Sequence, residues 1–183
     1  MRVRWSAAVG LTVIGLLLTA CSDDGGPATL PDVSPSTPAT SPLATPTGDP
    51  TAQLEAEITA FYEDYVQTIN ESFASTDALA RRSQMFVASC LHCQRGLALA
   101  RRAHDEQLVL EGGELSTHAV SLDAVTDEIA TFSVVSSAAA GGLIDGAGRV
   151  VQELAESTNL HVTYQARRQP AGRWILISSE VVS

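Results

Sequence analysis

The sequence contains no lysine, so all 11 of its Lys and Arg residues are arginine, against 21 acidic residues and a formal net charge of -10. A surface this acidic repels phosphate backbones and anionic lipid headgroups. We therefore expect no nucleic-acid partner. Any contact with a membrane must then come from something other than the charge of the folded part.

Cysteine and proline are also scarce where a domain is expected. Of the 8 prolines only Pro170 lies beyond residue 53, and the three cysteines are Cys21, Cys90 and Cys93. There is no second Cys-x-x-Cys and no His-x-x-x-His, so the sequence predicts no metal site. Gln94 follows Cys93 where covalent haem attachment needs histidine. We expect no cofactor.

The one long apolar run lies at the N-terminus, from about Ala7 to Leu18, behind a basic start that carries Arg2 and Arg4. Its length of about a dozen residues is too short for a membrane span, which needs roughly 20, and is typical of a secretory signal. The run ends in Leu18-Thr19-Ala20-Cys21, which resembles a bacterial lipobox. That resemblance implies removal of residues 1–20 and lipidation of Cys21. We expect a lipid-anchored protein on the extracytoplasmic face of the cell membrane.

Residues 21–53 are rich in Pro, Ser and Thr and carry almost no large apolar side chains. Such composition cannot build a core and is typical of a disordered, extended tether. The remaining residues, 54–183, have the length of one domain. The sequence therefore predicts a signal peptide, a lipidated tether and a single domain.

The domain opens with helical periodicity. Apolar residues recur at steps of three and four from Leu54 to Phe73, which predicts a long amphipathic helix. A short second helix is predicted over 78–82, after Ser75-Thr76-Asp77, which is typical of a helix stop followed by an N-cap. A third helix is predicted from Cys90 or Leu91 to His104, with Ser89 as its possible cap.

After Gly112-Gly113 the pattern changes to the alternation of strands. Strands are predicted over 115–125, 128–137, 160–167 and 173–182, with a hairpin around the glycines of 141–148. Helices first and an antiparallel meander afterwards predict an α+β fold, in which N-terminal helices pack on a curved antiparallel sheet.

Several short motifs support a family resemblance. They are Phe61-Tyr62 with Tyr65, Cys90-Leu91-His92-Cys93, Glu111-Gly112-Gly113-Glu114 and Gly172-Arg173-Trp174. Together they resemble an actinobacterial surface lipoprotein family whose domain has no assigned function. That family is similar to the cone-shaped fold of nuclear transport factor 2 and the ketosteroid isomerases. The resemblance implies a cone-shaped domain and brings no catalytic residues.

Cys90 and Cys93 are predicted to form a disulfide, because the protein is expected outside the cytoplasmic membrane. Two roles stay open. The disulfide is either a structural staple across the loop into the third helix, or a site of thiol–disulfide exchange. The staple is favoured, since no strand of a βαβ unit precedes the motif.

The expected role is non-enzymatic, either binding of a small apolar ligand in the cone or interaction with an envelope protein. A cavity lined by the cone's aromatic residues favours the ligand; these residues are Tyr62, Tyr65, Phe132, Tyr164 and Trp174. A filled cone with an exposed apolar face favours the protein partner. An isomerase-like enzyme is a further alternative, and its available carboxylates are Asp64, Asp123 and Asp127. The arginine pairs, such as Arg81-Arg82, are interpreted as solvated or paired with carboxylates.

Overall fold

A computed structural model describes residues 49–126 and 128–182 of the chain. The predicted signal peptide, Cys21 and nearly all of the predicted tether lie outside the described residues. Among the helices in the described part, none is long and apolar enough to cross a membrane.

Three helices come first: α1 (Pro50–Glu71), α2 (Thr76–Ser83) and α3 (Leu91–Asp105). The long first helix is confirmed, but it begins at Pro50 and not at Leu54. Proline suits the first helical position, and the Asp49 side chain accepts a hydrogen bond from the Thr51 amide at 2.9 Å. The last residues assigned to the tether therefore belong to α1.

The caps of the two shorter helices differ in how well the sequence predicts them. The cap of α2 lies in the predicted segment Ser75-Thr76-Asp77: it is Ser75, whose Oγ accepts a hydrogen bond from the Ala78 amide at 3.2 Å, so α2 begins at Thr76 and not at Ala78. At α3 the cap position is held by Cys90 and not by Ser89. The Ser89 hydroxyl donates instead to the Ile177 carbonyl at 3.2 Å, which ties the loop to the last strand.

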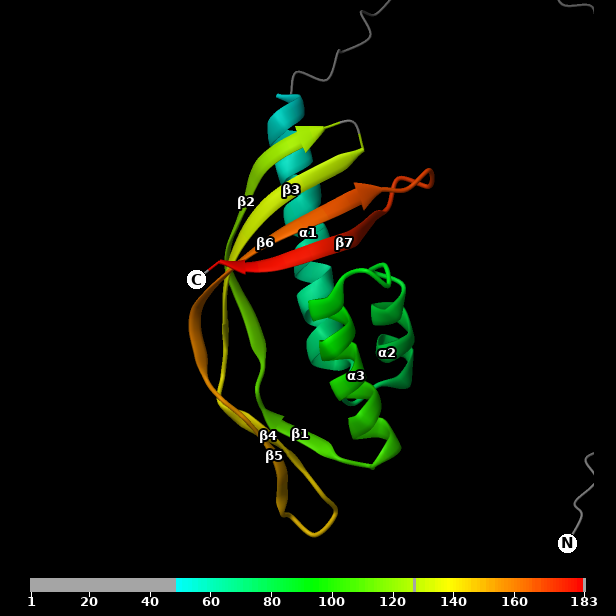
Figure 1. Ribbon diagram of the computed structural model, residues 1–183, viewed down its shortest axis with the longest axis vertical. Helices are drawn as coiled ribbons and strands as arrows, with labels where there is room; N and C mark the ends of the chain where they lie inside the picture. The colour runs from blue at the N-terminus through cyan, green and yellow to red at the C-terminus, as the bar shows by residue number, and fades with distance from the viewer. Residues whose placement is uncertain (1–48, 127, 183) are drawn as a thin grey trace, which may run out of the picture. The chain divides into compact units, whose positions relative to one another are not determined.

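Seven strands follow, all paired antiparallel: β1 (Val109–Gly112), β2 (Leu115–Thr126), β3 (Ile129–Ala138), β4 (Gly141–Ile144), β5 (Val150–Leu154), β6 (Ser157–Arg168) and β7 (Trp174–Val182). They form a sheet of order β2-β3-β6-β7 and a smaller one of order β1-β4-β5. The predicted strands and the 141–148 hairpin are confirmed, whereas β1 was not predicted. Figure 1 shows the larger sheet curving along α1, with α2 and α3 beside the lower half of that helix.

The two sheets are joined where β1 runs into β2 and β3 runs into β4, and the chain bends at both of these junctions. Across the break the Gly113 amide donates to the Ala140 carbonyl at 3.2 Å, and the Ala139 amide donates to Glu114 at 3.0 Å. Gly112 and Gly113 have φ of 65° and 74°, which L side chains rarely adopt. A Cβ on Gly141 would lie 2.6 Å from the Glu111 carbonyl oxygen. The bend therefore depends on glycine in both crossing strands.

The core lies between the inner face of α1 and the concave face of the larger sheet. Ile58, Tyr62 and Tyr65 are at most 3% exposed, and they face alternate residues of β3 and β6 such as Phe132 and Tyr164. Side chains in a strand point alternately to opposite faces, so the alternation in the sequence becomes one buried face. The expected α+β fold, with N-terminal helices on a curved antiparallel sheet, is thus confirmed.

Replacement of Gly141 by alanine is expected to destabilise the domain by about 1–3 kcal/mol, the usual cost of overpacking. The added Cβ would meet the Glu111 carbonyl at the strand crossing. Gly146→Ala is the matched control, because a Cβ there meets nothing within 4 Å. Urea unfolding of the two variants measures the difference; equal stabilities would contradict the tight crossing.

Candidate functional site

A cavity of about 420 Å³, open to solvent on one side, lies between the helices and the concave sheet. Its lining comes from every layer that meets there: Tyr62, Tyr65, Ile69, Phe73, Arg82, His92, Arg95, Gly96, Leu99, Gly113, Leu115, Ser136, Ala138, Leu154, Leu160, Val162 and Tyr164. Most of these residues are apolar or aromatic. A concave, mainly apolar cavity with a few polar groups is the usual form of a small-molecule site.

Of the five aromatic residues predicted for this cavity three line it, and Phe132 and Trp174 do not. Tyr62, Tyr65 and Tyr164 line it, and the Tyr62 hydroxyl donates to the Tyr164 hydroxyl at 3.5 Å. Phe132 is fully buried behind them, with its ring stacked on Tyr164 at 5.5 Å between centroids. Trp174 lies elsewhere, in a separate surface hollow of about 330 Å³. The structure therefore assembles the three tyrosines and leaves Phe132 and Trp174 out of the lining.

Burial keeps the three tyrosine hydroxyls protonated. It raises the pKa of Tyr62 and of Tyr65 from 10.0 to about 12, and it raises the pKa of Tyr164 still further. Loss of water around the phenolate is the main cause in each case, because a buried charge is poorly solvated. At neutral pH the cavity wall therefore offers neutral hydroxyl groups.

Arg82 is the one charged cavity-lining residue that is buried, with 3% of its surface exposed. Its Nη1 donates to the Ser72 hydroxyl at 3.0 Å, whereas its buried Nε has no partner among the described residues. The ion pairs of the described part of the chain do not include it. Burial lowers the pKa of this guanidinium, with the nearby Tyr65 opposing the shift, yet arginine stays charged at neutral pH. The positive charge thus has only neutral side chains around it.

Gly96 of α3 makes room for this side chain. A Cβ at Gly96 would lie 2.5 Å from Arg82 Nη2, which is closer than real contacts allow. The guanidinium of Arg82, which projects from α2, therefore packs against the backbone of α3 at Gly96, where that helix has no side chain. The position of Arg82 depends on this close approach of two helices.

The charges around the cavity are all of one sign. Two arginines line it, and of the described lining residues none is acidic. Arg95 and His92 are exposed, so they lie where the cavity meets solvent, whereas Arg82 lies within. This is unusual in a chain whose formal net charge is -10. The cavity is therefore locally positive.

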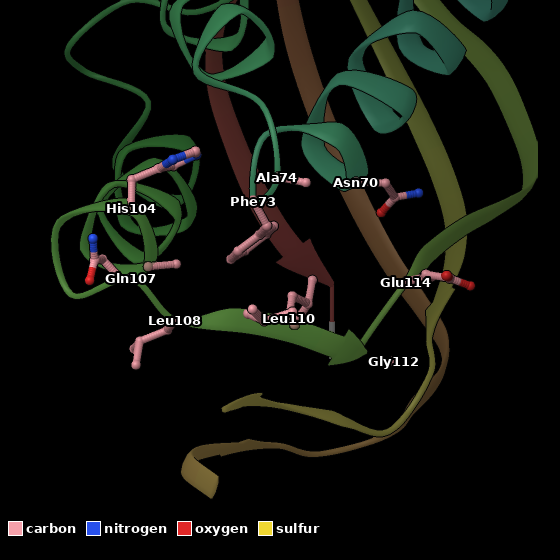
Figure 2. Close-up of a pocket in the computed structure, with 11 residues that line it drawn as sticks. Asn70, Phe73, Ala74, His104, Gln107, Leu108, Leu110, Gly112 and Glu114 are labelled. Atoms are coloured by element: carbon pink, nitrogen blue, oxygen red, sulfur yellow. The ribbon is translucent and has the colours of Figure 1, made fainter. Parts of the chain in front are cut away.

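A second hollow of about 510 Å³ lies between the end of α1, the end of α3 and β1. Figure 2 shows Phe73 pointing from the turn after α1 toward Leu110 of β1, and Phe73 lines both hollows. Two of its polar side chains are already engaged: Asn70 bonds the backbone of Leu115 in both directions, and His104 Nε2 lies 2.9 Å from the Ser72 carbonyl. Asn70 and His104 therefore already have hydrogen-bond partners in the protein and are less available to a ligand in this hollow.

The disulfide between Cys90 and Cys93 is present, as predicted. Both cysteines are at most 2% exposed and belong to the main core cluster. A buried disulfide is poorly placed for attack by an external thiolate. Its position at the start of α3 matches the structural staple. Among the described residues no group of His, Cys, Asp and Glu has the form of a metal site.

The carboxylates weighed for an isomerase-like site lie away from the tyrosines. Asp64 lines the hollow beside Trp174, with its Oδ1 4.0 Å from Arg81 Nη2. Asp123 is exposed and accepts a hydrogen bond from the Ser133 hydroxyl at 2.6 Å. Asp127 lies outside the described residues. The described part of the chain therefore brings no acid to the tyrosine hydroxyls.

The sequence interpretation of Arg82 was wrong, because this residue is neither solvated nor paired with a carboxylate. The sequence held one signal: Ala78 and Arg82 are four residues apart on the predicted short helix, so they share a face. The structure buries both residues of that face. The neighbouring Arg81 fits the original interpretation, since it pairs with Glu71 at 3.1 Å and is half exposed.

Comparison with known proteins gives similarity of structure only. No protein-family model and no curated protein matches the chain. Aln2 from a Streptomyces species is similar at 17% identity and a TM-score of 0.44, over 73% of this chain and 91% of that one. A Catenulispora acidiphila protein in complex with S-DNPA is similar at 13% identity and a TM-score of 0.47, over 71% and 92%.

An uncharacterized protein with a cystatin-like fold from Caulobacter vibrioides is similar at 14% identity and a TM-score of 0.43, over 70% of this chain and 89% of that one. These likenesses concern the path of the backbone and assign no function. The resemblance to an actinobacterial lipoprotein family stays a prediction.

Stability is expected to fall as pH rises from about 10 toward about 12, by about 2–3 kcal/mol for each of Tyr62 and Tyr65. The folded pKa values lie above the unfolded ones, so the unfolded chain loses its protons first and is favoured there. Below pH 10.0 both states are protonated and this contribution to stability is complete. Urea unfolding at several pH values measures the effect.

All 3 tyrosines of the chain belong to this cluster, so tyrosinate absorbance reports on it alone. In the folded protein we expect no titration near the ordinary tyrosine pKa. Tyrosinate that forms there without unfolding would contradict the burial of these hydroxyls.

Proposed function

We propose that this domain binds a small molecule with an apolar body in the cavity between its helices and the concave sheet, and does so without catalysing a reaction. The observation that carries the proposal is the cavity itself, about 420 Å³ between the helices and the concave sheet. That volume lies within the range of known small-molecule sites, about 300–1,000 Å³. A cone filled by its own side chains would have favoured a protein partner instead.

The chemistry of the lining supports binding over catalysis. Isomerase-like catalysis asks for a carboxylate near the reacting carbon and a tyrosine or second acid to stabilise the enolate. The described lining provides the tyrosines without the carboxylate. Thiol–disulfide exchange gains no support, because the cysteines are buried in the core. Binding needs only the apolar walls and a few polar groups, and both are present.

We further propose that Cys21 carries a lipid that holds the domain on the extracytoplasmic face of the cell membrane. The support is the sequence, in which a basic start and a short apolar run precede Leu18-Thr19-Ala20-Cys21. A membrane-tethered domain with such a cavity fits a role in capturing a small molecule at the envelope.

Filling the cavity should abolish binding. In Leu99→Trp the larger side chain would occupy space now open at the wall formed by α3, and we expect the affinity for a neutral apolar probe, phenylnaphthylamine, to fall about tenfold or more. Leu91→Trp is the matched control, because Leu91 is 68% exposed at the start of the same helix. Titration of the purified full chain measures both affinities.

Equal affinity in the two variants would place the probe outside the cavity. Absence of any binding to the unaltered protein would contradict the proposed function, provided that circular dichroism shows the fold to be intact.

Replacement of Cys21 by serine should release the protein from membranes, because serine offers no thiol for lipidation. Cell fractionation with detection of the chain in membrane and soluble fractions tests this. Cys90→Ser with Cys93→Ser is the control, since it removes the other two cysteines and leaves the lipidation site unchanged. Unaltered membrane association of the Cys21→Ser chain would contradict the lipid anchor.

A further inference from the structure

We propose that the ligand of this cavity is an organic anion, an acidic head group such as a carboxylate joined to an apolar body, and that Arg82 binds the head group. This inference rests on the proposed function and names the class of ligand.

The first support is the uncompensated charge of Arg82. A buried charge without a partner is costly, and buried arginines are normally paired with carboxylates or phosphates. Arg82 is 3% exposed, its neighbours Ser72 and Tyr65 offer only neutral hydroxyls, and its Nε is unsatisfied among the described residues. The adjacent Arg81 has two carboxylates within 4.0 Å. An anion in the cavity would supply the missing partner.

The second support is the sign of the lining. The chain has 21 acidic residues against 11 basic ones, yet the described lining holds Arg82, Arg95 and His92 and no acid. In a protein this acidic, a cavity whose described lining holds two guanidinium groups and no carboxylate favours anions over neutral and cationic molecules. The exposed Arg95 lies on α3 at the cavity's solvent side, where it can attract an anion before Arg82 binds it.

The third support is the donor geometry. A guanidinium presents its donors as a planar fork that matches a carboxylate; the neutral hydroxyls of Ser72 and Tyr65 are its neighbours here, and Nε has no partner among the described residues. Nη2 packs against the backbone of α3 at Gly96, so the missing Cβ holds the fork in place. The protonated hydroxyls of Tyr65 and Tyr164 add neutral donors on the same cavity wall. Apolar residues such as Leu99 remain for the body of the ligand.

The test compares two probes that differ by one charged group, anilinonaphthalene sulfonate and its uncharged counterpart phenylnaphthylamine. We expect the purified full chain to bind the sulfonate about 10- to 100-fold more tightly, the range for a charged hydrogen-bonded contact. Arg82→Gln should erase this preference, so that the variant binds the two probes with about equal affinity. Arg81→Gln is the control, because Arg81 is half exposed and pairs with Glu71, so the preference should persist.

Arg95→Gln gives an independent test at an exposed position, where folding is not at risk; it should lower the preference for the sulfonate by about two- to fivefold. If Arg82→Gln does not fold, the comparison of the two probes on the unaltered chain and on Arg95→Gln decides the matter. Equal binding of both probes to the unaltered chain, or a preference that survives Arg82→Gln, overturns the inference while the cavity-binding function stands. Failure of both probes to bind overturns the proposed function as well.

Discussion

The packing of α1 onto the concave face of the larger sheet is the contact on which the rest of the domain depends. Tyr62 lies against Phe132 and Tyr164 at ring-centroid distances of 6.0 and 5.2 Å, so helix and sheet share an aromatic core. Large rings fill the centre and contribute most of the apolar area buried there. A single helix cannot fill the whole concavity of a bent sheet. The cavity lies in the part that α1 leaves unfilled, where residues of α1 and α3 both line it.

The bend of the sheet determines how large that concavity is. Glycines at the crossing of β1–β2 with β3–β4 allow backbones to approach more closely than any side chain would permit. The strands then turn toward α3 and carry Leu154 and Leu160 to the cavity wall. The cavity is thus a consequence of backbone geometry at a few glycines, and its chemistry comes from the helices that cover it.

Much of this fold could be predicted because it depends on local pattern. Three elements can each be predicted from a short stretch of sequence. They are α1, from its period of three to four residues, β6, from its alternation, and the β4–β5 hairpin, from its glycines. The ends of the helices were predicted less accurately. The helix α1 begins at Pro50 and not at Leu54, and the cap of α3 is Cys90 and not Ser89. The strand β1 was missed because four residues show no reliable period. Its structure comes from pairing with β4, which is distant in sequence.

The sequence by itself determined the order of the helices and of every strand but β1, the cysteine pair and the tyrosines that face the core, because each follows from periodicity or spacing along the chain. Only the tertiary structure shows that Trp174 lies outside the cavity and that Arg82 lines it without a carboxylate partner among the described residues. Adjacent arginines look alike in sequence. Their difference arises from what each meets in space: Glu71 beside Arg81, and the gap at Gly96 beside Arg82. Charge pairing depends on distances between separate elements, and no local pattern records them.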